Sequence, residues 1–315
     1  MSNYLITGIA GFIGSNIARA LLAQGDSVRG IDNFVTGKRA NLEDLKGIEF
    51  IDGTIEAPES CARACRGVEF VFHEAALASV PRSVTDPVST NNANVTGTLN
   101  LLVAARDAGV GRVVYAGSSS AYGDQPTLPK REDMIPDPIS PYAVSKLAGE
   151  HYVRSFTRVY GLETVTLRYF NVFGPHQDPS SQYSGVLAKF SLGMLEGRTP
   201  VIYGDGTQSR DFTYIENVVT ANLLAIAAPA ESVSGGVFNV ATEQRITLND
   251  AVRSLRELTG YAGPVEYEPA RAGDIAHSLA DISRARAAFG YEPKVNFHEG
   301  LSRTLAWYRK VADAK

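Results

Sequence analysis

Residues 4–14, with the sequence YLITGIAGFIG, constrain the fold more than any other stretch of this chain. A short apolar run meets three glycines, Gly8, Gly11 and Gly14, and an amphipathic helical pattern then continues to about Gly25. A strand, a glycine turn and a helix N-terminus form an anion site, because bare N–H groups and the helix dipole face the ligand. Missing side chains also let a pyrophosphate approach the backbone. The stretch therefore predicts a dinucleotide-binding turn, with close helix–strand packing as the structural alternative.

A carboxylate stands at the end of the second predicted strand. The apolar run 28–31 leads into Asp32, about eighteen residues after Gly14. An acid at this point can accept hydrogen bonds from the adenosine ribose of a dinucleotide. Because a carboxylate would repel a 2′-phosphate, Asp32 favours NAD over NADP, although Lys38 and Arg39 follow closely and leave room for NADP.

Strand and helix patterns alternate at least five more times after this unit, which predicts an α/β fold with a doubly wound parallel sheet. The 315 residues carry a net charge of −4, so there is no basic footprint for nucleic acid. No apolar run reaches membrane-spanning length, and no leader pattern precedes Tyr4. We therefore expect a soluble, cytoplasmic protein that binds neither nucleic acid nor membrane.

Three residues of reactive type are interpreted as structural. Cys61 and Cys65 lie four apart in a predicted helix, without the further ligands that a metal site needs, so we expect buried thiols and no metal. His73 follows a buried strand, and no nucleophile is near it in sequence, so we expect a packed histidine.

A serine cluster and a Tyr–Lys pair predict the catalytic site. The strand predicted over residues 112–116 leads into Ser118, Ser119 and Ser120. Ser140 and a following proline then open a helix that extends to Gly161. In this helix Tyr142 and Lys146 are four apart and therefore share a face.

These side chains suit proton transfer next to a dinucleotide. To act as a base near neutral pH, the phenolate of Tyr142 must be stabilised by about 3 pKa units, or roughly 4 kcal/mol. The Lys146 ammonium and a positive nicotinamide ring could supply that stabilisation. A serine hydroxyl could then pass a substrate proton to Tyr142 and hold a developing oxyanion.

With these features in place, the chain resembles the extended short-chain dehydrogenase/reductases, and within them the NAD-dependent nucleotide-sugar epimerases. The resemblance covers nearly the whole sequence and rests on the segments TGIAGFIG, DNFVTG, HEAALASVPRS, NANVTGTLN, YAGSSSAYG, SPYAVSK, RYFNVFGP, GDGTQSRDFTYIENV and RAGDIAHSLADISRA. It implies a Rossmann domain over residues 1–172 and a smaller, interleaved α/β nucleotide-sugar-binding domain over 173–315. Segments near 210–228 and 237–242 would return to the first domain, and residues 237–240 are the expected return strand.

The resemblance and the glycine turn together define the predicted site. Tyr142, Lys146 and either Ser118 or Ser119 would be catalytic; the serine choice stays open because the run before Tyr122 is one residue shorter than in many relatives. The predicted NAD contacts are Gly8, Gly11, Phe12, Ile13, Gly14, Asp32, Asn33, Gly37, Lys38, Ile55, Ala75, Ala76, Asn94, Tyr142, Lys146 and Tyr169. Thr54 stands where the family often has an aspartate that contacts adenine, so that contact is predicted to be missing.

A second set of residues is predicted to bind a UDP-sugar: Val80, Ser120, Asn171, Val201, Tyr203, Arg210, Arg271, Asp274 and Ser278. By resemblance, Arg210 and Arg271 would grip the phosphates, for which a guanidinium fork suits bidentate binding. Asp274 would bind the ribose, and Val201 and Tyr203 the uracil. Asn94 and Tyr169 would both border the nicotinamide.

The resemblance implies epimerisation at C4 through a 4-keto sugar that turns over and takes the hydride back. Ser120 and Ala121 stand where sugar dehydratases carry an Asp-Glu pair, which disfavours dehydration. Ser278 matches a gatekeeper position where a small residue admits an N-acetyl group, so UDP-GlcNAc and UDP-GalNAc are the expected substrates, with UDP-glucose and UDP-galactose also accepted. The alternatives are a UDP-glucuronate 4-epimerase or another NAD-dependent nucleotide-sugar enzyme, a reductase that releases its cofactor, and a non-catalytic NAD(H)-binding regulator. Relatives pair through a four-helix bundle, here formed by helices 94–109 and 142–161, so a homodimer is expected.

Overall fold

The computed structural model describes residues 1–179, 185–270 and 275–313 and is organised around one seven-stranded sheet. The strand order is β11-β6-β5-β4-β1-β2-β3, and every neighbouring pair is parallel. The strands are β1 (Asn3–Thr7), β2 (Ser27–Asp32), β3 (Glu49–Asp52), β4 (Phe70–His73), β5 (Arg112–Ser118), β6 (Glu163–Tyr169) and β11 (Gly236–Val240). This topology confirms the doubly wound, Rossmann-type α/β fold.

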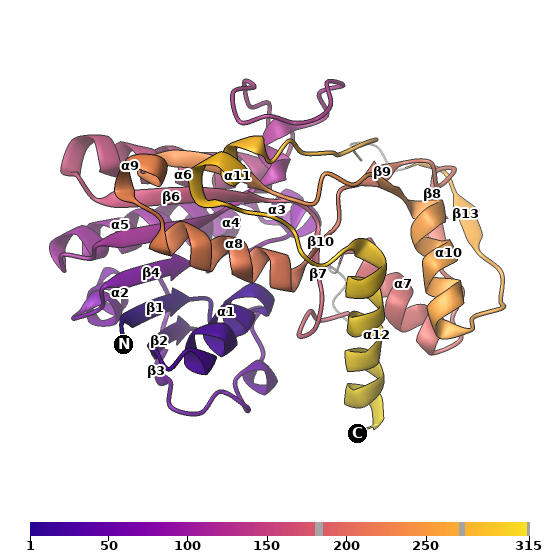
Figure 1. Cartoon of the computed structure of the whole chain (residues 1–315), viewed down its shortest axis with the longest axis horizontal. Helices are drawn as coiled ribbons and strands as arrows, with labels where there is room; N and C mark the ends of the chain where they lie inside the picture. Colours follow the sequence, from indigo (N-terminus) through magenta and orange to yellow (C-terminus); the bar gives the residue numbers. More distant parts are fainter. Residues whose placement is uncertain (180–184, 271–274, 314–315) are drawn as a thin grey trace.

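Helices cover both faces of the sheet. On the face turned toward the viewer in Figure 1 lie α1 (Phe12–Ala23) and α8 (Ile215–Ala227). The other face carries α2 (Pro58–Cys65), α5 (Gly97–Asp107) and α6 (Pro141–Tyr160). Helix α5 contacts both α2 and α6, and α6 also packs on β5 and β6. Central strands are consequently buried along most of their length, as in β5, where six successive residues are buried.

The helix that carries the Tyr–Lys pair begins and ends where its sequence requires. The Ser140 hydroxyl accepts a hydrogen bond from the Ala143 N–H at 3.2 Å, and Pro141 occupies the first helical position. Gly161 closes α6 with a left-handed φ of 73°, a conformation that costs glycine little. The Ser140 cap sets the start of α6 at Pro141, so Tyr142 lies in the first turn of this helix.

The helix predicted over residues 94–109 has a different form. It starts earlier, with α4 (Pro87–Asn91), and passes through a π-helical turn (Asn92–Thr96) before α5. A π turn inserts an extra residue and changes which side chains point inward. Here it buries Asn94, whose amide then reaches the loop after β4.

The rest of the chain forms a smaller group of helices and short strands, on the right of Figure 1. Its helices are α7 (Val186–Leu195), α10 (Leu248–Thr259) and α12 (Phe297–Asp313). Its strands pair as β7 (Val172–Phe173) with β10 (Thr213–Tyr214), β8 (Val201–Tyr203) with β13 (Glu266–Glu268), and β9 (Ser209–Arg210) with β12 (Ile246–Thr247). Short segments complete the fold: η1 (Arg39–Asn41), α3 (Val80–Thr85), η3 (Ser119–Tyr122), α9 (Ala230–Val233) and α11 (Ser283–Phe289).

Chain order and spatial order differ between these parts. Strand β11 follows β8, β9 and β10 in sequence, yet it pairs with β6 and forms an edge of the main sheet. Helix α8 likewise returns to pack on α1, β5 and β6. The domain limits at residues 172 and 173 stay a prediction.

The structure agrees with the interpretation of the two cysteines as buried thiols. Cys61 and Cys65 are fully buried free thiols on α2, and burial raises the pKa of each to about 12.

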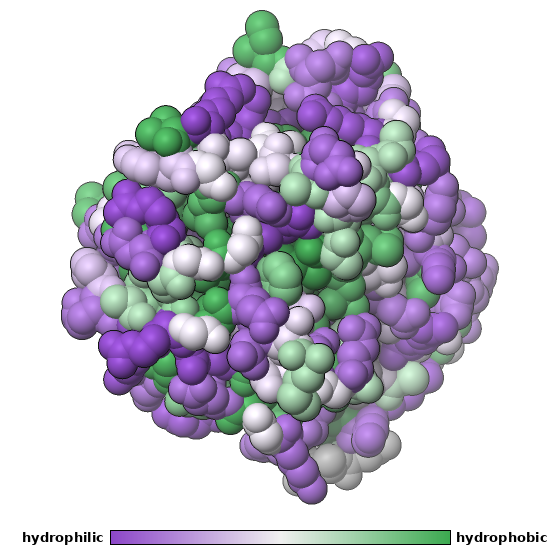
Figure 2. Space-filling model, turned by 60° about the vertical axis from the view of Figure 1, so that its left-hand side comes forward, coloured by the Kyte–Doolittle hydropathy of each residue, from purple (hydrophilic) through white to green (hydrophobic). Residues whose placement is uncertain are grey.

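On the face of the molecule seen in Figure 2, apolar residues gather toward the middle and polar residues surround them. Within the described ranges, no helix is both long and apolar enough to cross a membrane.

Candidate active site

A cleft of about 500 Å³ opens at the carboxyl ends of β1, β2 and β4. Its floor is the glycine turn, where Gly8 has a φ of 70° and a Cβ on it would lie 2.8 Å from the Ala75 Cα. A Cβ on Gly14 would lie 2.4 Å from the Gly8 carbonyl oxygen, so neither position admits a side chain. The predicted NAD contacts that line this cofactor cleft are Gly8, Gly11, Phe12, Ile13, Gly14, Asp32, Asn33, Ile55, Ala75 and Ala76.

Asp32 stands at the rim of the cofactor cleft and is fixed by backbone donors. Its two carboxylate oxygens accept hydrogen bonds from Ala10 N at 2.9 Å and Phe34 N at 2.8 Å. Burial raises the pKa of Asp32, and these backbone hydrogen bonds oppose that rise. Gly37 packs close by, because its Cβ would lie 3.0 Å from the Asp32 Oδ1. A side-chain-free cradle with a fixed carboxylate at the next strand end fits the diphosphate and ribose of NAD.

Two residues beside this rim have other partners. The Lys38 ammonium forms an ion pair with Asp178 at 2.6 Å and is absent from the residues that line the cleft. The Thr54 hydroxyl accepts a hydrogen bond from Glu56 N at 3.2 Å, so this side chain stabilises the local turn that follows β3. Its role at the adenine end stays a prediction.

The Tyr–Lys helix brings the proposed catalytic groups together. Tyr142 hydrogen-bonds to the Ser118 side chain, and the Ser118 hydroxyl also contacts the Ser120 hydroxyl at 2.8 Å. The Lys146 ammonium lies over the ring of Tyr115, 4.5 Å from its centroid. Of the two candidate serines, Ser118 is favoured because it contacts Tyr142. Ser119 begins the 3₁₀ turn η3.

The pKa of Tyr142 is shifted upward, whereas a base near neutral pH needs it to be lowered. Burial raises the pKa of Tyr142, and the hydrogen bond to Ser118 lowers it in part. A buried phenol loses the solvation of its charged form, and this effect wins over the hydrogen bond. Burial also lowers the pKa of Lys146, to about 8, against the attraction of Glu74. The protein groups alone therefore leave the Tyr142 phenol protonated at neutral pH.

Two polar residues under the site are structural in their contacts. His73 is fully buried between hydroxyls, with Nδ1 2.8 Å from Thr7 Oγ1 and Nε2 2.9 Å from Thr98 Oγ1. Burial lowers its pKa to about 3, so the imidazole is neutral and packed, as expected. The Asn94 amide bonds the Leu77 N–H at 2.7 Å and the Ser145 hydroxyl at 2.9 Å, which joins the cleft wall to the residue before Lys146.

Tyr169 contacts a carboxyl group that the sequence interpretation did not select. Its hydroxyl donates to Glu74 Oε1 at 2.9 Å and accepts from Asn222 Nδ2 at 2.9 Å. Glu74 lines the cofactor cleft, and burial raises its pKa to about 7. The Arg82 side chain also lines the cleft and was not selected either. The sequence signal that could have pointed to Glu74 is its place between the buried strand that ends at His73 and the small residues Ala75 and Ala76.

Two of the predicted substrate residues, Asn171 and Ser278, meet at the backbone of Asp211, whose carboxylate is buried. Asn171 Nδ2 donates to the Asp211 carbonyl at 3.1 Å and to the Ser278 hydroxyl at 3.2 Å. The Asp211 N–H donates to the same hydroxyl at 3.3 Å. Asn171 has a left-handed φ of 35°, held by these contacts. Asn171 and Ser278, 107 residues apart in sequence, therefore meet at one point.

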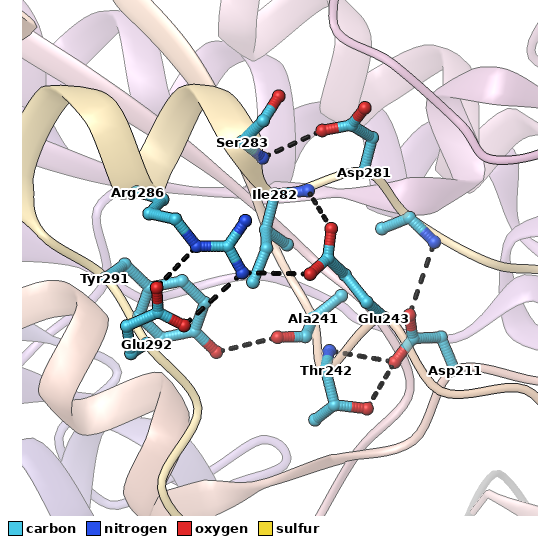
Figure 3. A network of polar contacts seen from close by, with 11 residues as sticks. Asp211, Ala241, Thr242, Glu243, Asp281, Ile282, Ser283, Arg286, Tyr291 and Glu292 are labelled. Atoms are coloured by element: carbon cyan, nitrogen blue, oxygen red, sulfur yellow. Dashed lines mark hydrogen bonds and ion pairs between the residues drawn. The ribbon is translucent and has the colours of Figure 1, made fainter.

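The Asp211 side chain ties together three distant segments (Figure 3). Its carboxylate accepts from Thr242 N at 2.9 Å, Thr242 Oγ1 at 2.8 Å and Ala280 N at 3.2 Å. Burial raises its pKa to about 6 despite these donors. Next to it, Glu243 accepts from Ile282 N and Arg286, which joins the same two segments again. Sequence reasoning missed Asp211 because its partners lie far along the chain.

The other predicted substrate residues are more dispersed. Val80 starts α3 and is 43% exposed, Ser120 contacts Ser118, and Val201 and Tyr203 lie on β8. Arg210 lies on β9, where its guanidinium donates to the Ser209 carbonyl at 2.9 Å. Arg271 and Asp274 lie outside the described residues.

Comparison with known proteins decides what kind of enzyme this geometry belongs to. Residues 4–241 match the model of the NAD dependent epimerase/dehydratase family. The chain belongs to this family. The predicted resemblance is thereby confirmed, and the protein is an NAD-dependent enzyme whose cradle and Asp32 would hold the cofactor.

Among related proteins of this epimerase/dehydratase family, three carry different sugars in their names. The UDP-glucose 4-epimerase of Thermotoga maritima, crystallised with UDP-glucose, is 39% identical; the match covers 98% of this chain and 99% of that one, with a TM-score of 0.94. The UDP-N-acetylglucosamine 4-epimerase of Methanobrevibacter ruminantium, in complex with UDP-N-acetylmuramic acid, is 39% identical over the same shares, with a TM-score of 0.93. The UDP-glucuronate 4-epimerase of Thermodesulfobacterium geofontis is 35% identical over 98% of this chain and 97% of its own length.

Proposed function

We propose that this enzyme is a UDP-sugar 4-epimerase that interconverts UDP-N-acetylglucosamine and UDP-N-acetylgalactosamine, and UDP-glucose and UDP-galactose as well. The 4-epimerase activity is supported by family membership and by all three relatives. The observation that carries the proposal is the contact between Tyr142 and Ser118, with the buried Lys146 one turn further along the same helix. A binding-only regulator would have no use for a proton acceptor held in this way.

In this proposal, each catalytic side chain has one task. Ser118 orients the sugar 4-hydroxyl and passes its proton to Tyr142. Lys146 supplies positive charge that stabilises the Tyr142 phenolate, since an opposite charge favours the ionised form. The glycine cradle and Asp32 would hold NAD, and the bound cofactor would supply the acceptor for the C4 hydride. Tyr142 and Ser118 give the proton back to the 4-keto oxygen, and the epimer forms when the keto sugar has turned its other face toward the cofactor before the hydride returns.

The preference for acetylated sugars rests on Ser278. Its small side chain is 8% exposed, and its hydroxyl is held by Asn171 Nδ2 and the Asp211 N–H. The gatekeeper position thus offers no aromatic ring to collide with a substituent at the sugar 2-position. Asn171, Arg210 and Arg271 are proposed to hold the diphosphate, with Asp274 on the ribose and Val201 and Tyr203 at the uracil.

The test is a panel of UDP-sugars incubated with the purified enzyme, with products read at C4 by NMR. We expect epimers of UDP-GlcNAc, UDP-GalNAc, UDP-glucose and UDP-galactose. Turnover of UDP-glucuronate alone would replace this assignment with the activity named for the Thermodesulfobacterium relative. Tyr142→Phe is the control: we expect loss of about 10³-fold in turnover with NAD still bound. Undiminished turnover in that variant would overturn the catalytic assignment.

We propose further that two copies pair through α5 and α6. Val144, Tyr152 and Val159 on α6 are 52%, 37% and 69% exposed, which leaves apolar area on the outer face of this helix. A second copy would cover it in a four-helix bundle. Light scattering should give twice the chain mass for the wild type and the monomer mass for Val159→Glu; a monomeric wild type would contradict the pairing.

A further inference from the structure

Glu74 and Tyr169 meet although their strands are not neighbours. Glu74 directly follows β4, Tyr169 ends β6, and β5 lies between these two strands in the sheet. In the register, Ser118 of β5 stands beside Tyr169. The 2.9 Å hydrogen bond from the Tyr169 hydroxyl to Glu74 therefore spans the end of β5, at the strand that carries the catalytic serine. This hydrogen bond places the carboxyl group of Glu74 close to the end of β5, where Ser118 lies.

The position of this acid is fixed from several elements. Tyr169 is held in turn by Asn222 of α8, whose Nδ2 donates to its hydroxyl at 2.9 Å. On the opposite side, the Lys146 ammonium from α6 lies over the Tyr115 ring of β5. The His73 ring on β4 lies tilted against the same ring, with centroids 5.4 Å apart, and is neutral. His73 pairs with Tyr115 in the register of β4 and β5, so Glu74, the next residue, lies near the ring that carries the Lys146 ammonium, and its charge acts on that ammonium.

We propose that Glu74 is a positioning residue of the active site, whose carboxylate supplies the countercharge that keeps the buried Lys146 protonated while Tyr169 holds that carboxylate in place. The inference rests on the proposed function, in which the Lys146 ammonium stabilises the Tyr142 phenolate. A fully desolvated ammonium favours its neutral form, and an opposite charge is what counters this tendency. The attraction of Glu74 acts on Lys146 in that direction, and the attraction of Lys146 acts in return to favour the ionised Glu74.

The countercharge matters more when the oxidised cofactor occupies the cleft. The nicotinamide ring of NAD is positive in that state, and a like charge near Lys146 would drive it further toward the neutral form. Glu74 offsets this second positive charge as well as the burial. Its own pKa of about 7 means that it is mostly ionised in the range where Lys146 titrates, near pH 8.

The experiment measures the titration of Lys146 itself in the NAD-bound enzyme. Lysine labelled with ¹³C at Cε is incorporated, the Lys146 signal is assigned from its loss in Lys146→Arg, and its shift is followed from pH 6 to 10. In Glu74→Gln, which keeps the size of the side chain and an acceptor for Tyr169, we expect the Lys146 midpoint to fall by about 1 pH unit. The alkaline limb of kcat/KM should move to lower pH with it.

A matched control and a second variant keep the test decisive. Glu56→Gln removes an exposed carboxylate from another part of the same cleft and should leave the Lys146 midpoint unchanged. Tyr169→Phe removes the hydroxyl that stabilises the ionised Glu74, so it should lower the midpoint by less than Glu74→Gln does. A Lys146 midpoint that is the same in Glu74→Gln as in the wild type would overturn the inference. Because the titration needs no sugar turnover, a failed proposal of function would show separately, as inactivity on the UDP-sugar panel.

Discussion

The cofactor cleft and the substrate side, meaning Asn171, Arg210, Asp211 and Ser278, differ in the length of chain that their contacts span. The glycine turn closes on itself, because a Cβ on Gly14 would strike the Gly8 carbonyl six residues earlier. The carboxylate of Asp32 bonds Ala10, 22 residues away.

On the substrate side the spans are longer. The Asp211 carboxylate reaches over 31 and 69 residues, and Asn171 bonds Ser278 over 107.

This difference teaches how each part depends on the rest of the fold. One strand–turn–helix unit with the next strand supplies the floor of the cofactor cradle and the Asp32 carboxylate, and the loops after β3 and β4 add the walls. The substrate side exists only when several segments have met, and a few polar side chains hold them there. We therefore expect steric changes to damage the cleft, and changes of size, charge or hydrogen bonding to damage the substrate side.

Among the predictions that test this comparison, the largest expected effect concerns the gatekeeper position, Ser278. Ser278→Tyr places a ring where the Asn171 amide and the Asp211 N–H now meet a small hydroxyl. Turnover of UDP-GlcNAc should fall by about 100-fold, from overpacking against the N-acetyl group, and that of UDP-glucose far less. Steady-state kinetics on both sugars measure this ratio.

Ser278→Ala is the matched control, because it removes the hydroxyl but keeps the site small. It should retain turnover of UDP-GlcNAc. Equal losses on both sugars in Ser278→Tyr would show that size at this position does not select the substrate, and the gate would be abandoned.

A smaller effect is expected from a methyl group in the cofactor cradle. Gly14→Ala should weaken NAD binding by about 30-fold, because the 2.4 Å approach to the Gly8 carbonyl forces the turn to shift, at about 2 kcal/mol. Isothermal titration with NAD gives the affinity.

Gly25→Ala is the matched control, because it also places a side chain in the glycine-rich N-terminal unit. Nothing lies within 4 Å of a Cβ at this position, so the variant should keep its NAD affinity, although the φ of 84° should cost it some stability. Equal affinities in the two variants would contradict the steric account.

The same difference in span explains what sequence reasoning could find. The glycine turn, Asp32 and the pairing of Tyr142 with Lys146 follow from strand ends and helical spacing, which are local properties. A return strand over residues 237–240 was expected only through the family resemblance, because the pairing of β11 with β6 depends on tertiary packing. The π turn that buries Asn94 also depends on packing, and it altered the helix predicted over residues 94–109.

Glu74 and Asp211 were missed for a related reason. Their chemistry comes from burial and from partners on strands and loops far along the chain, and no spacing in the sequence reveals it. The raised pKa of Tyr142 belongs to the same class, because burial decides it and the helical spacing of Tyr142 and Lys146 does not.

The last prediction concerns stability instead of binding or turnover, and is a pH dependence that belongs to the substrate side alone. Asp211 is fully buried, and its pKa rises from an ordinary value near 4 to about 6 in the fold. The folded chain therefore binds this proton more tightly than the unfolded chain does, so the contribution of Asp211 is most favourable below pH 4 and is lost as the pH rises through 6. Over this window the loss is at most about 3 kcal/mol.

Asp211→Asn cannot titrate, so the unfolding free energy of the wild type, measured in urea relative to this variant, should fall from pH 4 to pH 7. Glu74 and all other acids are present in both proteins and cancel in the difference. A constant difference across that range would mean that the carboxylate is as well solvated by its Thr242 and Ala280 donors as it is in water, and that the substrate side is held together without cost from its buried charge.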